Sequence, residues 1–144
     1  MYTKLDSAGN DLPQSAEQWA LVRDDRTGLI WSAADSSSRD VTFEKAQGAI
    51  ANLNGAKFCG FDDWRLPTIQ ELLSIVDYSR RSPAIDTNFF WGTKNDWYWS
   101  STPAAASPAD CAWIVNFNHG GSDWGYHDAR SRVRAVRSVP RASQ

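Results

Sequence analysis

The sequence predicts one domain of the α+β class, and three observations lead to this prediction. A length of 144 residues is typical of a single domain. Two segments with apolar residues at helical spacing lie in the first half of the chain. The second half contains strand-like segments separated by loops rich in Pro, Gly and Ser. Helices followed by a loop-rich group of strands are typical of α+β proteins.

The predicted domain covers residues 18–139, with an irregular, polar N-terminal arm over residues 1–17 and a tail at residues 140–144. Residues 19–23 and 29–31 predict two strands, because their apolar side chains flank a polar turn that contains glycine. The domain is therefore expected to open with a hairpin.

The first helix is predicted after a polar loop over residues 32–40. Thr42 has a hydroxyl that can cap the helix. The apolar face is predicted to contain Phe43, Ala46, Ile50 and Leu53. Asn54 and Gly55 tolerate positive φ angles and are expected to end the helix.

The second helix is predicted over about residues 69–78, after an extended segment. Pro67 keeps the residue before it out of the α region, so the chain should be extended up to that point. Thr68 can cap the helix, and Glu71 can reach back to the Thr68 amide. The two residues therefore predict a capping box.

The remaining elements are predicted to be strands and long loops. Residues 97–101 and 111–117 predict two strands, and residues 131–139 predict a closing strand. Small residues dominate the loop over residues 104–110, whereas residues 118–130 form a loop rich in Gly, His, Asp and Ser.

Charge and hydropathy exclude two classes of partner. The net charge is −2, with 15 basic and 17 acidic residues interspersed, which argues against nucleic acid. No run approaches the roughly 18 apolar residues of a membrane span, and the N-terminus lacks the apolar core of a signal peptide. The basic cluster near the end alternates as strand side chains do, and contains Arg130, Arg132, Arg134, Arg137 and Arg141.

The two cysteines leave two alternatives open. An even count allows one disulfide between Cys59 and Cys111 but does not require it. Their separation of 52 positions fits no zinc or thioredoxin-like spacing. The pair is either bridged or present as two buried free thiols.

The charged residues near the second helix are expected to be structural. Adjacent carboxylates such as Asp62 and Asp63 commonly cap a turn, with a calcium site built from loop oxygens as the alternative. Arg65 is expected to pair with a nearby carboxylate, either Asp63 or Glu71, rather than to bind an anion.

The sequence motifs give little support to catalysis or to metal binding. His119 and His127 lie in one loop, but a zinc site needs three or four converging ligands. We therefore expect both histidines to be exposed and to contact a ligand. No Gly-x-Ser-x-Gly motif is present. We predict that the protein is not an enzyme and needs no cofactor.

Five blocks occur in a fixed order along the chain, and together they identify a family. They are TGLIW at 27–31, DWRLPT at 63–68, YWSST at 98–102, AWIVNF at 112–117 and VRAVR at 133–137. Over residues 18–138 the chain resembles the Legionella collagen-like protein C-terminal domain family. The resemblance implies a C-type-lectin-like fold, with two helices packed on small antiparallel sheets and long loops that bind ligand. Members are mostly surface or secreted modules of bacteria and phages, and the namesake is a trimeric adhesin head that binds sulfated glycans.

The chain departs from the family pattern at one cysteine pair. The closing strand has Ala135 where relatives commonly have Cys. The first helix has Ala49 and Ile50 near the position of the partner. The usual bridge is therefore missing, and Cys59 with Cys111 is the pair that remains to supply a different one.

Some relatives are diversified by retroelements that vary adenine-containing codons near the C-terminus. Such variation of an AAY codon cannot produce Lys, Glu or Gln. Residues 95–143 contain none of the three, whereas residues 1–94 contain eleven. Trp124 does not fit such codons and would be a fixed scaffold residue. The alternative is that strands and tight turns simply lack long flexible side chains.

The sequence thus predicts an extracellular or surface-exposed adhesin or receptor-recognition module, on a cell or a phage particle. Its ligand would be a glycan or a protein. The alternative is a structural, trimeric head without catalytic activity. The predicted ligand-binding residues are Trp91, Trp97, Ala106, Ser107, Asp110, His119, Ser122, Asp123, Trp124, Tyr126, His127, Asp128 and Arg130.

Overall fold

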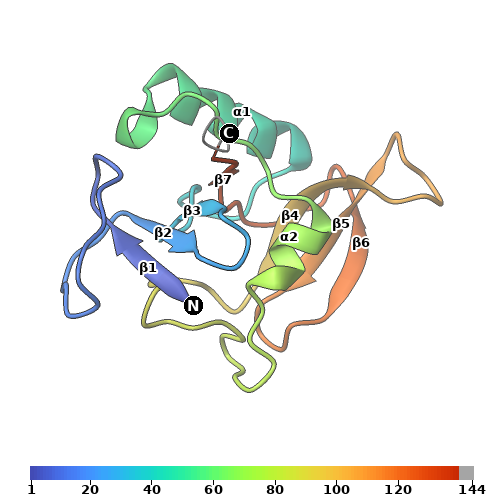
Figure 1. Ribbon diagram of the computed structural model, residues 1–144. Coiled ribbons are helices and arrows are strands. Elements are labelled where there is room, and N and C mark those ends of the chain that lie inside the picture. The colour runs from blue at the N-terminus through green and yellow to red at the C-terminus, as the bar shows by residue number, and fades with distance from the viewer. Residues whose placement is uncertain (140–144) are drawn as a thin grey trace.

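A computed structural model describes residues 1–139, which fold into two small antiparallel sheets and two α-helices (Figure 1). In chain order the elements are β1 (Tyr2–Leu5), β2 (Leu21–Asp24), β3 (Ile30–Ser32), α1 (Phe43–Gly55), the short 3-10 helix η1 (Phe58–Gly60), α2 (Ile69–Ser74), β4 (Trp97–Pro103), β5 (Cys111–Asn116), β6 (Ser122–Tyr126) and β7 (Val136–Arg137). The predicted α+β class is confirmed. The predicted tail at residues 140–144 lies outside the described residues.

The first sheet has the strand order β1-β2-β3-β7, and its first strand corrects the predicted irregular arm over residues 1–17. Leu5 of β1 lies opposite Leu21 of β2 and is fully buried. The ammonium of Lys4 donates hydrogen bonds to two backbone carbonyls of the following loop. A single buried leucine and a sequestered lysine do not produce an apolar alternation, so the sequence pattern did not reveal this strand.

Both predicted N-caps are confirmed. The hydroxyl of Thr42 accepts a hydrogen bond from the third residue of its helix. Thr68 and Glu71 form the full capping box, each side chain accepting from the other's backbone N–H. Helix α2 ends at Ser74, earlier than predicted, because the chain turns there and the amide of Asp77 bonds to a loop carbonyl. No helix within residues 1–139 is long and apolar enough to cross a membrane.

The predicted hairpin and the two later strands are present as β2-β3 and β4-β5, but the predicted C-terminal elements need two corrections. The predicted loop over residues 118–130 contains β6, whose exposed polar residues hide its strand character. The predicted closing strand over residues 131–139 is shorter in the structure and consists of β7 alone. Other residues of that segment form isolated bridges to different parts of the chain instead of one continuous strand.

The core lies on both faces of the second sheet, which has the order β4-β5-β6. In β4, Tyr98 joins one buried cluster and Trp99 joins the other, because successive side chains of a strand point to opposite faces. Leu72 of α2 belongs to the first cluster, and Ile50 of α1 belongs to the second. The two helices therefore cover opposite faces of this sheet.

Three of the C-terminal arginines make internal ion pairs, whereas Arg130 is exposed. Arg132 pairs with Asp96 at 3.0 Å, and Arg137 pairs with Asp63 at 2.7 Å. Arg134 is fully buried. These side chains stabilise the fold and do not form a phosphate-binding surface. The fifth arginine of the cluster lies outside the described residues.

Both cysteines are free thiols, so the bridged alternative is wrong for this structure. Cys111 lies opposite Tyr126 in the β5–β6 pair. The next residue, His127, is tied to the start of α1, because its backbone carbonyl accepts a hydrogen bond from the amide of Phe43. Cys111 therefore lies near the start of α1. Cys59 follows the other end of α1, whose 13 residues span about 20 Å (Figure 1). A disulfide needs Cα atoms within about 7 Å of each other, and the length of this helix prevents that.

Candidate functional site

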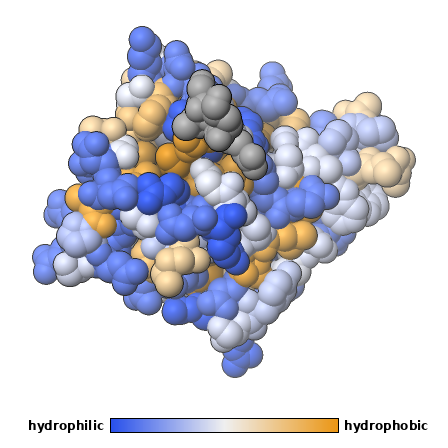
Figure 2. Space-filling model, in the orientation of Figure 1, coloured by the Kyte–Doolittle hydropathy of each residue, from blue (hydrophilic) through white to orange (hydrophobic). Residues whose placement is uncertain are grey.

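Most of the predicted site residues gather around β6 and the loop between β4 and β5, on the right of Figure 1. Within the described residues, β6 is an edge strand that pairs only with β5. The tip of the neighbouring loop is weakly apolar in Figure 2, in keeping with its exposed residues Ala105, Ala106 and Ala109. This end of the molecule presents a strand edge and a loop to solvent.

Trp124 and Tyr126 form an exposed aromatic pair on β6. Side chains two positions apart lie on the same face of a strand, and these rings meet edge to face with centroids 5.7 Å apart. They are 40% and 57% exposed, so both rings lie on the surface. Gly125 faces the opposite way, and a Cβ at that position would come within 3.2 Å of Ile114.

A hollow of about 310 Å³ lies beside the aromatic pair. It is lined by Asp110, Tyr126, His127 and Asp128. The amide of His127 donates to the carbonyl of Asp110 at 2.7 Å, which ties the β4–β5 loop to the end of β6. The two predicted loops therefore meet here, although their residues are separated along the chain.

Helix α1 fixes the position of His127. The imidazole stacks on Phe43 with a centroid distance of 4.3 Å and an interplanar angle of 12°. Beyond it lies a second hollow of about 500 Å³, to which α1 and its N-cap contribute Thr42, Glu44 and Gln47. The sequence analysis missed these three residues, because no motif or spacing connects the start of α1 with a loop more than 80 residues later.

The site combines flat aromatic surface with hydrogen-bond acceptors. Two exposed rings offer large contact area, and the carboxylates of Asp110, Asp128 and Glu44 can accept from hydroxyl or N–H groups of a ligand. Within residues 1–139, no group of three or more His, Cys, Asp or Glu side chains is placed to hold a metal ion. The arrangement suits non-covalent recognition of a polar ligand.

Several predicted residues lie along β6 or beyond it. His119 precedes β6, and its Nδ1 accepts from the amide of Gly121 at 3.1 Å. The five residues of β6, about 17 Å long, separate it from His127, so the two histidines do not converge. Ser122, Asp123 and Arg130 are further predicted residues that are exposed, on the strand and after it. Ser107 lies in the β4–β5 loop and is half-buried, and its hydroxyl donates a hydrogen bond to the carboxylate of Asp110 at 3.3 Å.

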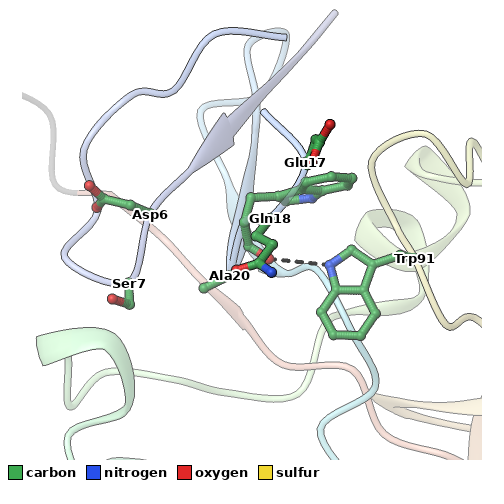
Figure 3. A pocket seen from close by; sticks show the side chains of 7 residues that line it. Asp6, Ser7, Glu17, Gln18, Ala20 and Trp91 are labelled. Atoms are coloured by element: carbon green, nitrogen blue, oxygen red, sulfur yellow. Dashed lines mark hydrogen bonds between the residues drawn. The ribbon is translucent and has the colours of Figure 1, made fainter. Parts of the chain in front are cut away.

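The two remaining predicted tryptophans lie outside this face. Trp97 is half-buried and packs against the core cluster on the α1 side. Trp91 is 47% exposed, on the β1–β2 side of the molecule, opposite β6 (Figure 1). Its indole N–H donates to the carbonyl of Trp19 at 3.2 Å (Figure 3). Trp91 lines a separate hollow on that side of the molecule, together with Asp6, Ser7, Glu17, Gln18 and Ala20.

A buried charged cluster shows clear pKa shifts but is not part of the surface hollows. Burial raises the pKa of Asp35 and of Tyr98, and it lowers the pKa of Arg134. Arg134 donates to the backbone carbonyls of Ser32 and Ala33 at 2.8 and 2.6 Å. The cluster therefore anchors the segment after β3 and has no access to a ligand.

Comparison with known proteins adds one finding to this geometry. A family model described as the Lcl C-terminal domain matches residues 20–137. The match includes both helices and every strand from β2 to β7. No curated protein matched the chain.

Proposed function

The chain belongs to the Lcl C-terminal domain family, and on that premise we propose that it is a non-catalytic recognition domain of an extracellular or cell-surface protein. The proposed binding face consists of β6, the loop between β4 and β5, and the start of α1. Its ligand is a glycan or a protein on a cell surface. The whole protein then acts as an adhesin or receptor-binding head, on a bacterium or a phage particle.

One observation carries this proposal. Trp124 and Tyr126 lie exposed next to each other on an edge strand, beside a hollow lined by Asp110, His127 and Asp128. Exposed aromatic rings bury much area on contact and lose little side-chain entropy. Neighbouring polar groups can then set the orientation of the ligand.

The rigidity of the face supports the same proposal. The backbone bond between His127 and Asp110 and the stacking of His127 on Phe43 order this part of the loop before any ligand arrives. A pre-ordered site avoids the entropy loss of ordering a loop on binding.

We extend the proposal to the fold family and to cofactors. Two helices on opposite faces of a small antiparallel sheet, with functional residues in the long loops, support a C-type-lectin-like assignment. Recognition is proposed to need no cofactor, with calcium as the alternative.

Diversification by a retroelement is proposed for the same face. The absence of Lys, Glu and Gln from residues 95–143 supports it, as does the exposure of His119, Ser122, Asp123 and Tyr126. A near-identical template repeat that differs only at adenines, beside a reverse transcriptase gene, is the expected genomic finding. A gene locus without such a repeat would contradict this part of the proposal.

Binding to an array of neutral and sulfated glycans tests the proposed face. Tyr126→Ala and His127→Ala should each abolish glycan binding. Tyr126→Ala should leave the melting temperature nearly unchanged because Tyr126 is largely exposed, whereas His127→Ala also removes the stacking on Phe43 and should lower it. Tyr78→Ala is the matched control, because Tyr78 is 71% exposed and packs near Gly120, at the other end of β6. Normal binding by the two site variants would show that the site lies elsewhere.

A structural, trimeric head is the second candidate. Within the described residues, the outer edge of β6 has no strand partner, and such an edge can pair with another chain. Light scattering separates the two candidates. A stable trimer that binds no ligand would favour the structural role, whereas a monomer that binds glycan would exclude it.

A further inference from the structure

A third hollow lies on the side of the molecule away from β6, between the β1–β2 connection and the loop before β4 (Figure 3). Its volume is about 620 Å³, and the residues that matter here are Asp6, Glu17, Gln18, Trp19 and Trp91. In Figure 3 the indole of Trp91 forms one wall, and Asp6 with Ser7 stands on the opposite wall. The hollow shares no lining residue with the face proposed above.

One indole of this hollow already holds an ammonium group. The Nζ atom of Lys4 lies 3.9 Å from the ring centroid of Trp19, a cation–π distance. Lys4 also donates to the backbone carbonyls of Gln14 and Ala16, at 2.7 and 2.8 Å. The protein itself therefore shows how a primary ammonium is satisfied in this region: by one ring and two carbonyl oxygens.

Within residues 1–139, no ammonium or guanidinium group lies over the indole of Trp91 as Lys4 does over Trp19. Nearly half of the side chain is exposed, and its N–H is already bonded to the carbonyl of Trp19. What Trp91 offers to a ligand is therefore its π face and not its donor. The same bond uses one of the two lone pairs of the Trp19 carbonyl, which leaves fewer acceptor positions for a primary ammonium.

The lining residues with charged side chains are acidic, and the nearby ammonium of Lys4 is already held by Trp19 and two carbonyls. Asp6 and Glu17 contribute carboxylates, and of the lining residues within 1–139 none is Lys or Arg. The backbone amides of Asn10 and Ala8 donate to Asp6, which lowers the pKa of its carboxyl and keeps it ionised at neutral pH. An anionic ligand is disfavoured here, whereas a cation gains from both the carboxylates and the indole.

We propose that this hollow binds a quaternary ammonium group of the choline type against the face of Trp91, with the carboxylates of Glu17 and Asp6 on other parts of the lining. Such a group has no N–H to satisfy, so it needs no carbonyl acceptors, and its methyl groups suit an aromatic wall. This second site is independent of the recognition face on β6. Either proposal can fail without affecting the other.

Titration of the full chain with choline chloride, followed by the indole N–H signal of Trp19 in nitrogen-15 NMR spectra, tests the proposal. A saturable shift is expected. The uncharged isostere 3,3-dimethylbutan-1-ol should bind at least about fivefold more weakly, because it lacks the charge that the ring and the carboxylates attract. The amide of Nα-acetyl-lysine should also bind more weakly than choline.

Variants connect the signal to the hollow. Trp91→Ala should abolish the choline-dependent shift, Trp91→Phe should weaken it, and Glu17→Gln should weaken it several-fold. Tyr78→Ala removes an aromatic ring that is exposed elsewhere and should bind choline as the parent does. Melting temperatures near that of the parent establish that the variants fold.

Three results would overturn the proposal. They are the absence of a saturable shift with choline, equal binding of choline and its uncharged isostere, and unaltered choline binding by folded Trp91→Ala. Saturable binding of uncharged sugars with no response to choline would likewise replace it with a saccharide site.

Discussion

Nη1 of Arg65 lies 2.6 Å from Oε1 of Glu71, the same oxygen that accepts the backbone N–H of Thr68. One carboxylate thus completes the capping box of α2 and binds the arginine of the extended segment before that helix. Its other oxygen accepts from Nη2 of Arg65 at 2.8 Å. The alternative partner, Asp63, pairs with Arg137 instead.

Glu71→Gln should lower the free energy of unfolding by about 1–2 kcal/mol at neutral pH, toward the low side of the range of about 1.5–3 kcal/mol for charged hydrogen bonds, because solvent screens this partly exposed pair. Burial by itself raises the pKa of Glu71, but hydrogen bonds from Arg65 and Thr68 outweigh burial and lower the pKa below its ordinary value of 4.5. The stabilisation is therefore present above pH 4.5 and is lost as the pH falls through the lowered pKa.

Urea unfolding of parent and variant at neutral pH and at steps below pH 4.5 measures this effect. The difference between the two should shrink as the pH falls. Glu44→Gln, at an exposed site in the first turn of α1, is the control and should show little difference at any pH. A difference that stays constant with pH would show that the Arg65 pair does not depend on the charge of Glu71.

Two glycine substitutions should change stability in opposite directions. A Cβ at Gly120 would lie 2.7 Å from Val76, and its φ of +88° disfavours any L side chain, so Gly120→Ala should destabilise by more than about 1 kcal/mol. Gly48 lies in α1 with open space around it, so Gly48→Ala should stabilise by about 0.8–1 kcal/mol. Thermal unfolding measures the stability change of each variant. Equal changes in the two variants would contradict these predictions from the local geometry.

Removing the buried guanidinium of Arg134 should destabilise strongly. Arg134→Ala leaves the half-buried charge partner Asp35 and the carbonyls of Ser32 and Ala33 without this donor, which should cost about 3–5 kcal/mol. Arg81→Ala, at an exposed position, is the control and should stay within about 0.5 kcal/mol of the parent. Chemical denaturation of both variants tests the contrast.

The thiols should behave as two free cysteines. Denatured protein prepared without reductant should show two reactive thiols per chain in a thiol assay. Reductant should not change the melting temperature of the native protein. In the folded state Cys59 should react before Cys111, because Cys59 is half-buried and Cys111 is fully buried. Burial also raises the pKa of the Cys59 thiol, so its reaction should be slow at neutral pH. A loss of stability on reduction would show that a bridge exists.

A chelator should leave stability and glycan binding unchanged. A cation that bound only the native state would raise the melting temperature, by an amount that grows with the logarithm of its concentration above the dissociation constant. Scanning calorimetry with millimolar calcium chloride and with excess EDTA measures this directly. A rise of several degrees with calcium would favour the calcium alternative over binding without a cofactor.

Short-range relations were predictable from the sequence. The capping box of Thr68 and Glu71 and the cap at Thr42 depend on residues three positions apart, so local spacing was enough to identify them. The strands β1 and β6 were missed for the opposite reason. Each is stabilised by a partner strand and shows no apolar alternation of its own, so its residues do not reveal it in isolation.

The candidate site was predictable only in part. The β4–β5 loop and the end of β6 do meet at Asp110 and His127, as the predicted set of residues required. The contribution of α1 through Phe43 was invisible, because it comes from stacking across the fold. The predicted set also combined His127 with His119 and Trp91, which the structure places at separate locations.

By itself, the sequence determined the α+β class, both helix caps and the family to which the chain belongs, because all of these depend on local spacing and ordered blocks. The tertiary structure decided which partners those residues take. The length of α1 separates Cys59 from Cys111, the tertiary fold pairs Arg137 with Asp63, and packing across the fold places His127 on Phe43. Such pairings arise from long-range burial and geometry, which no local pattern encodes.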